Sequence, residues 1–216
     1  MNIFDSLNHH SKMKRKTGRH LILSVVVLIC CSLFLMTGCE SGYTPKPRGY
    51  FRIQLPQKKY TTYNSIEPYT FEYPTYAVIS KDTDRNTEPF WINIYYPMFK
   101  GQLHVSYKHL SNNLTKYIED SRMLAYKHTV KADAINEEPI QTPNHIFGIL
   151  YDIEGNAASS TQFYITDSTT HFLRASLYFN ARTRSDSLAP VVQFIKKDIV
   201  HMIQTFKWKK VDSLIR

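Results

Sequence analysis

The sequence predicts an α+β domain in which two amphipathic helices pack on one mostly antiparallel β-sheet. Short strands of alternating polarity recur between residues 69 and 179, and helical spacing appears in residues 109–126. A second, longer helical pattern occupies residues 188–206. Strands joined by short polar segments, with helices set between and after them, are typical of antiparallel α+β domains.

The chain opens with a predicted signal peptide. An apolar run at residues 21–36 follows a basic cluster and leads into Gly38-Cys39. A bilayer span needs about 20 residues, so the run is short for a transmembrane helix. We expect cleavage of residues 1–38 and lipidation of Cys39, with an uncleaved membrane anchor as the alternative. Met13 would serve as a later translation start.

Removal of the signal peptide changes both the charge and the cysteine content. Five of the 27 Lys and Arg residues precede Cys39, but only Asp5 among the 18 Asp and Glu residues does, so the net charge falls from +9 to +5. A nucleic-acid partner is therefore not expected. The other cysteines, Cys30 and Cys31, lie in the signal peptide. The mature domain thus has no thiol for a disulfide or a thiolate metal site.

Residues 39–56 are predicted to be an extended tether and arm. Pro45 and Pro47 remove backbone donors that a helix or a central strand requires. Residues 49–56 alternate aromatic, basic and apolar side chains, which indicates an edge strand or an arm lying on the domain. Residues 57–216 then have the length of a single α+β domain.

The first strands of this domain are marked by alternation and by prolines. They are predicted at residues 69–73, 77–79, 90–96 and 103–107. The last two form an expected antiparallel hairpin across residues 97–101. Apolar side chains at helical spacing then predict a helix in residues 109–126, capped by Ser111 or Asn112.

Four more strands and a long helix complete the domain. The strands are predicted at residues 128–135, 145–153, 160–166 and 171–179, with Glu137-Glu138-Pro139 as one of the polar joints. The helix at residues 188–206 has eight apolar positions on one face. We expect Asp186 or Ser187 to cap it and Pro190 to lie in its first turn.

The sequence shows no constellation of residues for catalysis, a cofactor or a metal. The six histidines of the mature part form no motif with carboxylates, so each is interpreted as exposed or hydrogen-bonded. Asp82, Asp84 and Glu88 lack the spacing of a calcium loop. Ser160 has no glycine elbow around it. We therefore predict no enzyme, and no catalytic, cofactor or metal-binding residue.

Aromatic residues are abundant, with 15 Tyr and 12 Phe. Those that alternate along strands are expected to fill the core, with interface contact as the alternative. The arm lies outside this pattern and combines aromatic rings with cations, which favour protein interfaces. The candidate partner-binding residues are Tyr43, Lys46, Arg48, Tyr50, Phe51 and Arg52.

Several motifs carry a resemblance to a known family. The segment Tyr43-Thr44-Pro45-Lys46-Pro47-Arg48-Gly49-Tyr50-Phe51-Arg52-Ile53, close behind Cys39, resembles the start of the mature GldD gliding motility lipoproteins of the Bacteroidetes. Pro68-Tyr69-Thr70-Phe71-Glu72-Tyr73-Pro74 and Tyr151-Asp152-Ile153-Glu154-Gly155-Asn156 are similar to the same family. With the short strand Phe206-Lys207-Trp208 at the end, the element order also resembles PsbP-like domains, an analogy of fold alone.

The resemblance implies an envelope lipoprotein needed for gliding and for type IX protein secretion. Such a protein is expected to support other lipoproteins, notably GldJ, and not to catalyse a reaction. A multiply acylated Cys39 would hold it in the outer membrane, facing the periplasm. The alternative is a periplasmic module whose aromatic surface binds a glycan or a peptide.

Overall fold

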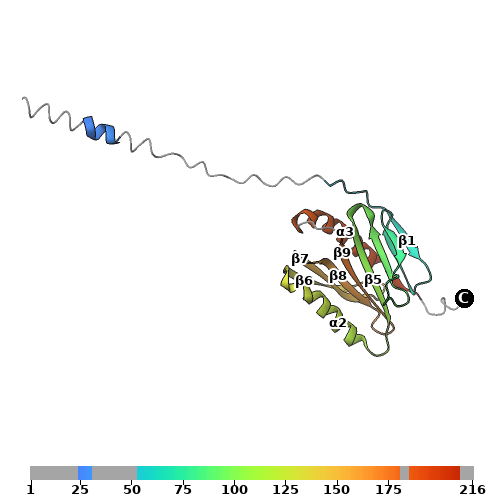
Figure 1. Ribbon diagram of the computed structural model, residues 1–216. Helices are drawn as coiled ribbons and strands as arrows, with labels where there is room; N and C mark the ends of the chain where they lie inside the picture. The colour runs from blue at the N-terminus through green and yellow to red at the C-terminus, as the bar shows by residue number, and fades with distance from the viewer. Residues whose placement is uncertain (1–23, 31–52, 181–184, 210–216) are drawn as a thin grey trace, which may run out of the picture. The chain divides into compact units, whose positions relative to one another are not determined.

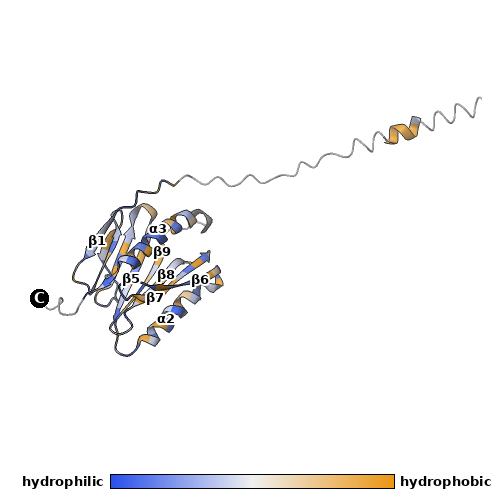
Figure 2. Cartoon of the chain, turned by 180° about the vertical axis from the view of Figure 1, so that it is seen from behind, coloured by the Kyte–Doolittle hydropathy of each residue, from blue (hydrophilic) through white to orange (hydrophobic). Residues whose placement is uncertain are grey.

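The computed structural model describes residues 24–30, 53–180 and 185–209 (Figure 1). The chain divides into two units, residues 1–49 and residues 50–216, which are treated separately. In the first unit, residues 24–30 are helical and almost wholly hydrophobic (Figure 2). None of the helices in the described ranges is long and apolar enough to cross a membrane.

The second unit contains two antiparallel sheets. The smaller has the order β1-β2-β10 and consists of β1 (Tyr60–Asn64), β2 (Tyr69–Pro74) and β10 (Lys207–Trp208). The larger has seven strands in the order β3-β4-β5-β9-β8-β7-β6. Its strands are β3 (Val78–Lys81), β4 (Ile92–Tyr96), β5 (Gly101–His109), β6 (Ala132–Gln141), β7 (Phe147–Gly155), β8 (Ser159–Thr166) and β9 (His171–Phe179).

Two long helices pack on opposite faces of the larger sheet (Figure 1). They are α2 (Leu114–Tyr126) and α3 (Ser185–Thr205), and two short 3-10 turns occupy Pro97–Phe99 and Lys127–Val130. The helix α3 also contacts β2, so its apolar side chains share one core with both sheets. The predicted α+β class with two packed amphipathic helices is confirmed.

The core contains the aromatic and aliphatic residues that alternate along the strands. Ile195 and Ile199 of α3 are 0 % exposed and pack with Leu103 and Tyr69, also 0 % exposed. On the other face, the Phe172 ring stacks on Tyr117 of α2 and on Tyr164, both with ring centroids 5.4 Å apart. Core packing of the alternating aromatic residues is therefore confirmed.

The predicted single sheet is wrong, because the N- and C-terminal strands form a sheet of their own. Trp208 of β10 pairs with Tyr69 of β2, and Tyr60 of β1 pairs with Pro74. The short C-terminal strand itself is confirmed. The β4–β5 hairpin is also confirmed, with Ile94 paired to Leu103.

One predicted joint and one predicted strand start are wrong. Glu137-Glu138-Pro139 lies inside β6, where Pro139 pairs with Ile149. The strand β6 is at the edge of the sheet, where a proline is tolerated because one side of the strand has no ladder partner. Its predicted start is also wrong, since Lys127–Val130 forms a 3-10 turn and β6 begins at Ala132.

The predicted helix starts also differ from the structure. Helix α2 begins at Leu114 after Asn113, whose side chain caps no helical N–H but instead accepts a hydrogen bond from the Ser111 N–H. Helix α3 begins at Ser185, ahead of the predicted caps, and it contains Pro190 in its interior. Helix boundaries are the part of a helix that sequence patterns locate least accurately.

Candidate functional site

The predicted lipidation and partner-binding residues lie outside the described residues. These are Cys39, Tyr43, Lys46, Arg48, Tyr50, Phe51 and Arg52. The described part of the arm starts at Ile53 and has no strand structure before Tyr60. Ile53 and Leu55 are 40 % and 42 % exposed, so this described part of the arm presents apolar side chains to solvent.

A buried carboxylate of α3 binds the segment that directly follows this arm. Asp198 is 1 % exposed and forms an ion pair with Lys58. The Lys58 ammonium also donates to the Phe194 carbonyl oxygen at 3.0 Å and lies 3.8 Å from the centroid of the Phe194 ring. The ion pair compensates the charge of a carboxylate that would otherwise be costly to bury.

Two tyrosines complete the surroundings of Asp198. The Tyr60 hydroxyl donates to Oδ1 at 2.9 Å and the Tyr76 hydroxyl to Oδ2 at 2.5 Å. Burial, together with the carboxylate, raises the pKa of Tyr60 and Tyr76 well above the ordinary value, so both remain donors. Because Asp198 is buried and Lys58, Tyr60 and Tyr76 all bind its carboxylate, the cluster acts as a structural clasp between β1, the turn after β2 and α3.

The described histidines are dispersed, and His171 and His201 have structural contacts. His171 is 5 % exposed, and its Nδ1 lies 2.7 Å from the Tyr107 hydroxyl. His201 Nε2 lies 2.7 Å from a Glu72 carboxylate oxygen, and its ring stacks on Tyr60 at 3.7 Å. Within the described ranges, no three His, Cys, Asp or Glu side chains come together in a way that would hold a metal ion.

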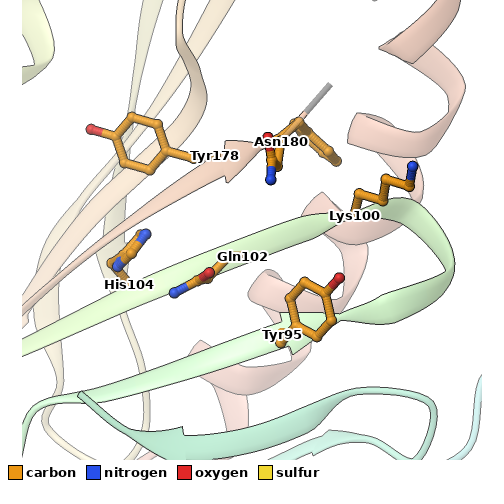
Figure 3. Close-up of a pocket in the computed structure, with 7 residues that line it drawn as sticks. Tyr95, Lys100, Gln102, His104, Tyr178 and Asn180 are labelled. Carbon is orange, nitrogen blue, oxygen red and sulfur yellow. The ribbon is translucent and has the colours of Figure 1, made fainter. Parts of the chain in front are cut away.

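A polar pocket lies on the face of the larger sheet opposite α3. It has a volume of about 640 Å³, and the residues that line it come from β4, β5, β9 and the segments adjoining them: Tyr95, Lys100, Gln102, His104, Tyr178, Phe179 and Asn180. Helix α2 covers Phe172 at the start of β9, whereas the pocket lies near the end of that strand. Figure 3 shows His104 and Gln102 between the rings of Tyr178 and Tyr95.

Strand register explains why these polar groups meet. Tyr95 pairs with Gln102 and Gln102 with Tyr178, so the three side chains occupy one row across three strands. Along β4 and β5, these polar side chains alternate with buried residues that point toward α3, such as Ile94 and Leu103. The same alternation that buries the core therefore builds a polar surface on the opposite face.

A second row of polar side chains adjoins the pocket. Asn93 pairs with His104, His104 with Ser176 and Ser176 with Gln162, so this polar row crosses four strands. Asn93 Oδ1, Ser176 Oγ and Gln162 Nε2 are buried and have no hydrogen-bond partner among the described residues. Ser176 is 2 % exposed and Gln162 1 % exposed. Unpaired buried polar groups are uncommon and require an explanation.

One cation lines the pocket, and a second, Arg174, lies in β9 outside the lining. Arg174 donates from Nη2 to Gln162 Oε1 at 2.6 Å, and burial lowers the pKa of its guanidinium, although Tyr178 and Tyr151 oppose this effect. None of the ion pairs formed by the described residues includes Arg174. Lys100 lines the pocket and no Asp or Glu does. Such a surface can donate hydrogen bonds and attract negative charge.

The sequence contained a signal for this pocket that composition alone did not reveal. Gln102, His104 and Ser106 alternate with apolar residues in β5, as Arg174, Ser176 and Tyr178 do in β9. Either pattern alone indicates only a solvent-facing side of a strand. The pairing of β5 with β9, which no local pattern shows, is what brings the two sets together.

Together these features define an α+β domain with a polar surface pocket. A family model described as "Gliding motility lipoprotein GldD" matches residues 40–208, most of the chain. The chain therefore belongs to the GldD family of gliding motility lipoproteins, and the resemblance seen in the sequence is confirmed. Membership indicates a lipoprotein associated with the cell envelope.

One solved structure with a similar chain is the solution structure of cyanobacterial PsbP (CyanoP) from Synechocystis sp. PCC 6803. The sequence identity is 12 % and the TM-score is 0.44, over 73 % of this chain and 97 % of the CyanoP chain. No curated protein matches the sequence.

Proposed function

We propose that this lipoprotein is a non-catalytic scaffold that stabilises partner lipoproteins of the gliding machinery and is required for type IX protein secretion. The match of the GldD family model carries the proposal, because it begins at residue 40, directly behind Cys39, and extends to residue 208. The family relationship supplies the link to gliding, and the position of the match supports Cys39 as the lipidated residue.

The proposed arrangement places the domain at the periplasmic side of the outer membrane. A multiply acylated Cys39 anchors firmly where a single chain binds only marginally. The tether then confines the domain near the membrane and raises its effective concentration for other anchored proteins such as GldJ. Ile53 and Leu55 follow the candidate partner-binding residues in the sequence, just ahead of Lys58 of the clasp. Both are exposed and offer further apolar surface to a partner.

Deletion of the gene tests this proposal. We expect lower levels of GldJ or other envelope lipoproteins, less type IX cargo in the medium and loss of spreading. Immunoblots, secretome analysis and colony spreading measure these effects, and restoration by the wild-type gene is the control. Unchanged partner levels together with a normal secretome and normal spreading would overturn it.

A second candidate function is a periplasmic module that binds a glycan or a peptide. The pocket formed by β4, β5 and β9 favours it, since ligand sites combine aromatic walls with a few polar groups. Purification from cells separates the two functions. A scaffold brings down envelope proteins, whereas a binding module retains a small molecule.

A further inference from the structure

The end of helix α2 presents an apolar surface that the proposed scaffold function does not use. Val130 is 89 % exposed, more than any other large hydrophobic side chain of the described residues. Met123 and Tyr126, one helical turn apart on α2, are 53 % and 38 % exposed. None of the three belongs to the cluster of side chains through which α2 packs on the larger sheet. A single exposed hydrophobic residue is ordinary, but neighbouring ones indicate a contact surface.

Backbone hydrogen bonds hold the turn that carries Val130. The Lys131 N–H donates to the His128 carbonyl oxygen at 2.9 Å, which closes the 3-10 turn at the end of α2. The Asn156 N–H donates to the Lys131 carbonyl oxygen at 3.0 Å and so ties the turn to the segment that follows β7. The fold therefore places the Val130 side chain in solvent at a defined position.

Cations accompany these apolar side chains. Arg122, Lys127 and Lys131 are exposed, and none of the ion pairs formed by the described residues includes them. Residues 122–132 contain no Asp or Glu. Burial lowers the pKa of His128, so the positive charge at neutral pH comes from the three exposed cations. We call this surface the α2 tip, and it consists of Arg122, Met123, Tyr126, Lys127, Val130 and Lys131.

Acidic side chains border the α2 tip on two sides. Glu137 of β6 accepts a hydrogen bond from the Tyr126 hydroxyl at 2.9 Å, and Asp133 is the second residue of the same strand. Glu119 is exposed further up α2. An anionic surface is therefore expected to contact the turn at Val130 and not β6 or the middle of α2.

The composition of the α2 tip fits a lipid surface better than a protein interface. Three apolar side chains are few for a stable protein interface, which buries about 1,200–2,000 Å² in total, and lysine is depleted in such interfaces. At a bilayer, apolar side chains enter the boundary between headgroups and acyl chains, while lysines bind anionic headgroups. The aliphatic stem of lysine lies along the apolar boundary and its ammonium group reaches the headgroups.

We propose that the α2 tip contacts the surface of the membrane that anchors the lipoprotein, with Val130 at the lipid boundary and Lys127 and Lys131 on anionic headgroups. A weak contact suffices, because the lipid anchor already confines the domain near the bilayer and raises its effective concentration there. The contact also limits which face of the domain turns toward the membrane. The inference rests on the proposed lipid anchor and is independent of the scaffold function.

Fluorescence quenching in reconstituted vesicles tests this proposal. The mature lipoprotein carries a fluorophore at Thr129→Cys, or at Gln193→Cys on α3 as the control, since both positions are exposed and the expected mature chain has no other free thiol. The vesicles contain equal parts of phosphatidylcholine and phosphatidylglycerol and a lipid with a nitroxide quencher. We expect quenching at Thr129→Cys to be at least about twofold stronger than at Gln193→Cys.

The dependence on lipid charge and the state of the anchor are measured in the same vesicles. High salt, or omission of phosphatidylglycerol, should reduce the difference between the two labels, because each weakens the attraction of the lysines. Equal quenching at the two positions, or a difference that neither salt nor lipid charge alters, would overturn the proposal. Flotation of the protein with the vesicles measures the lipid anchor, so a failed anchor and a failed contact are distinguished.

Two variants with matched controls locate the contact. We expect Val130→Asn and Lys127→Glu each to remove about half or more of the difference in quenching. Val78→Asn on β3 and Lys197→Glu on α3, also exposed, should leave it unaltered. Thermal unfolding checks that each variant is folded, and full quenching in both folded tip variants would contradict the assignment. A photocrosslink from Thr129 to an envelope protein in cells, without quenching in vesicles, would assign the α2 tip to a protein partner instead and overturn the membrane contact.

Discussion

The ammonium group of Lys58 pairs with the carboxylate of Asp198, 140 residues away in sequence, and so joins the segment after the N-terminal arm to the C-terminal helix α3. The carboxylate is shielded from solvent, while Lys58 keeps 25 % of its side chain exposed. Tyr60 and Tyr76 bind the same carboxylate from β1 and from the turn after β2. The clasp therefore fixes the segment that follows the arm, from Lys58 to Tyr60, against α3.

Loss of this ion pair should destabilise the domain. In Lys58→Met the Asp198 carboxylate remains buried without a countercharge, and removal of one partner from a buried pair costs about 3 kcal/mol. Urea unfolding of the two proteins measures the difference in the free energy of unfolding. Lys116→Met is the control, because Lys116 is exposed. A loss equal to that of the control would contradict the role of the clasp.

Stability should fall on mild acidification because of His171. Burial lowers the pKa of His171 below 6.5, although the nearby Asp167 opposes the shift. Between the folded and unfolded pKa values the unfolded state binds more protons, so the free energy of unfolding decreases as the pH falls through this window. Burial also lowers the pKa of His128, which adds to the effect.

Urea unfolding at about pH 7.5 and at about pH 5.5 measures this dependence. We expect a smaller difference between the two pH values in His171→Gln than in the wild type. The carboxyl of Asp167 does not titrate between these two pH values, so it does not contribute to the difference in stability. Burial favours a higher pKa for its carboxyl, but the N–H groups of His171, Thr170 and Thr169 together hold it below 3.8. An equal pH dependence in wild type and variant would exclude His171 as the cause.

A charge in the centre of α3 should abolish folding. Ile199 is 0 % exposed in the core that α3 shares with both sheets. An unpaired carboxylate in that position is far more costly to bury than the few kcal/mol by which a domain of this size is stable. We expect Ile199→Asp to be insoluble or to lack a cooperative thermal transition. Gln193→Asp, on an exposed position of the same helix, should fold normally.

Loss of the lipid should uncouple the domain from its partners. We expect Cys39→Ala to leave the outer-membrane fraction and to reduce GldJ levels as deletion does, because the tether no longer confines the domain. Membrane fractionation and immunoblotting measure both effects. Cys30→Ala, in the segment expected to be the signal peptide, is the control. Retention of Cys39→Ala in the outer membrane with normal GldJ levels would show that Cys39 is not the anchor.

Local patterns predicted the elements whose burial alternates strongly. The strand β9 was predicted with the bounds that the structure shows, since its apolar residues alternate. The long helix α3 was predicted from eight apolar positions, six of which are buried in the core. The strand β6 does not show alternating burial, and Glu137 and Glu138 in it are both exposed. It lies at the edge of the sheet, where Pro139 can be accommodated because one side of the strand has no hydrogen-bonded neighbour. Patterns within one segment do not identify which strands are at an edge.

Long-range pairing accounts for what the sequence did not show. The third strand of the smaller sheet, β10, depends on the pairing of Trp208 with Tyr69 across most of the domain. The clasp depends on Lys58 reaching Asp198, and the pocket on the register of β4, β5 and β9. Each of these residues alone was consistent with an ordinary surface or core position, so only the fold reveals the two clusters.

Crosslinking in living cells tests the scaffold proposal most directly. A photoreactive amino acid at Tyr50 or Arg52, and one at the exposed Lys116 of α2 as control, would be activated in cells that carry the tagged lipoprotein. We predict that the arm positions form a covalent adduct with an envelope lipoprotein such as GldJ and that Lys116 does not. Absence of such an adduct from both arm positions, or the same adduct from Lys116, would contradict a partner site in the arm.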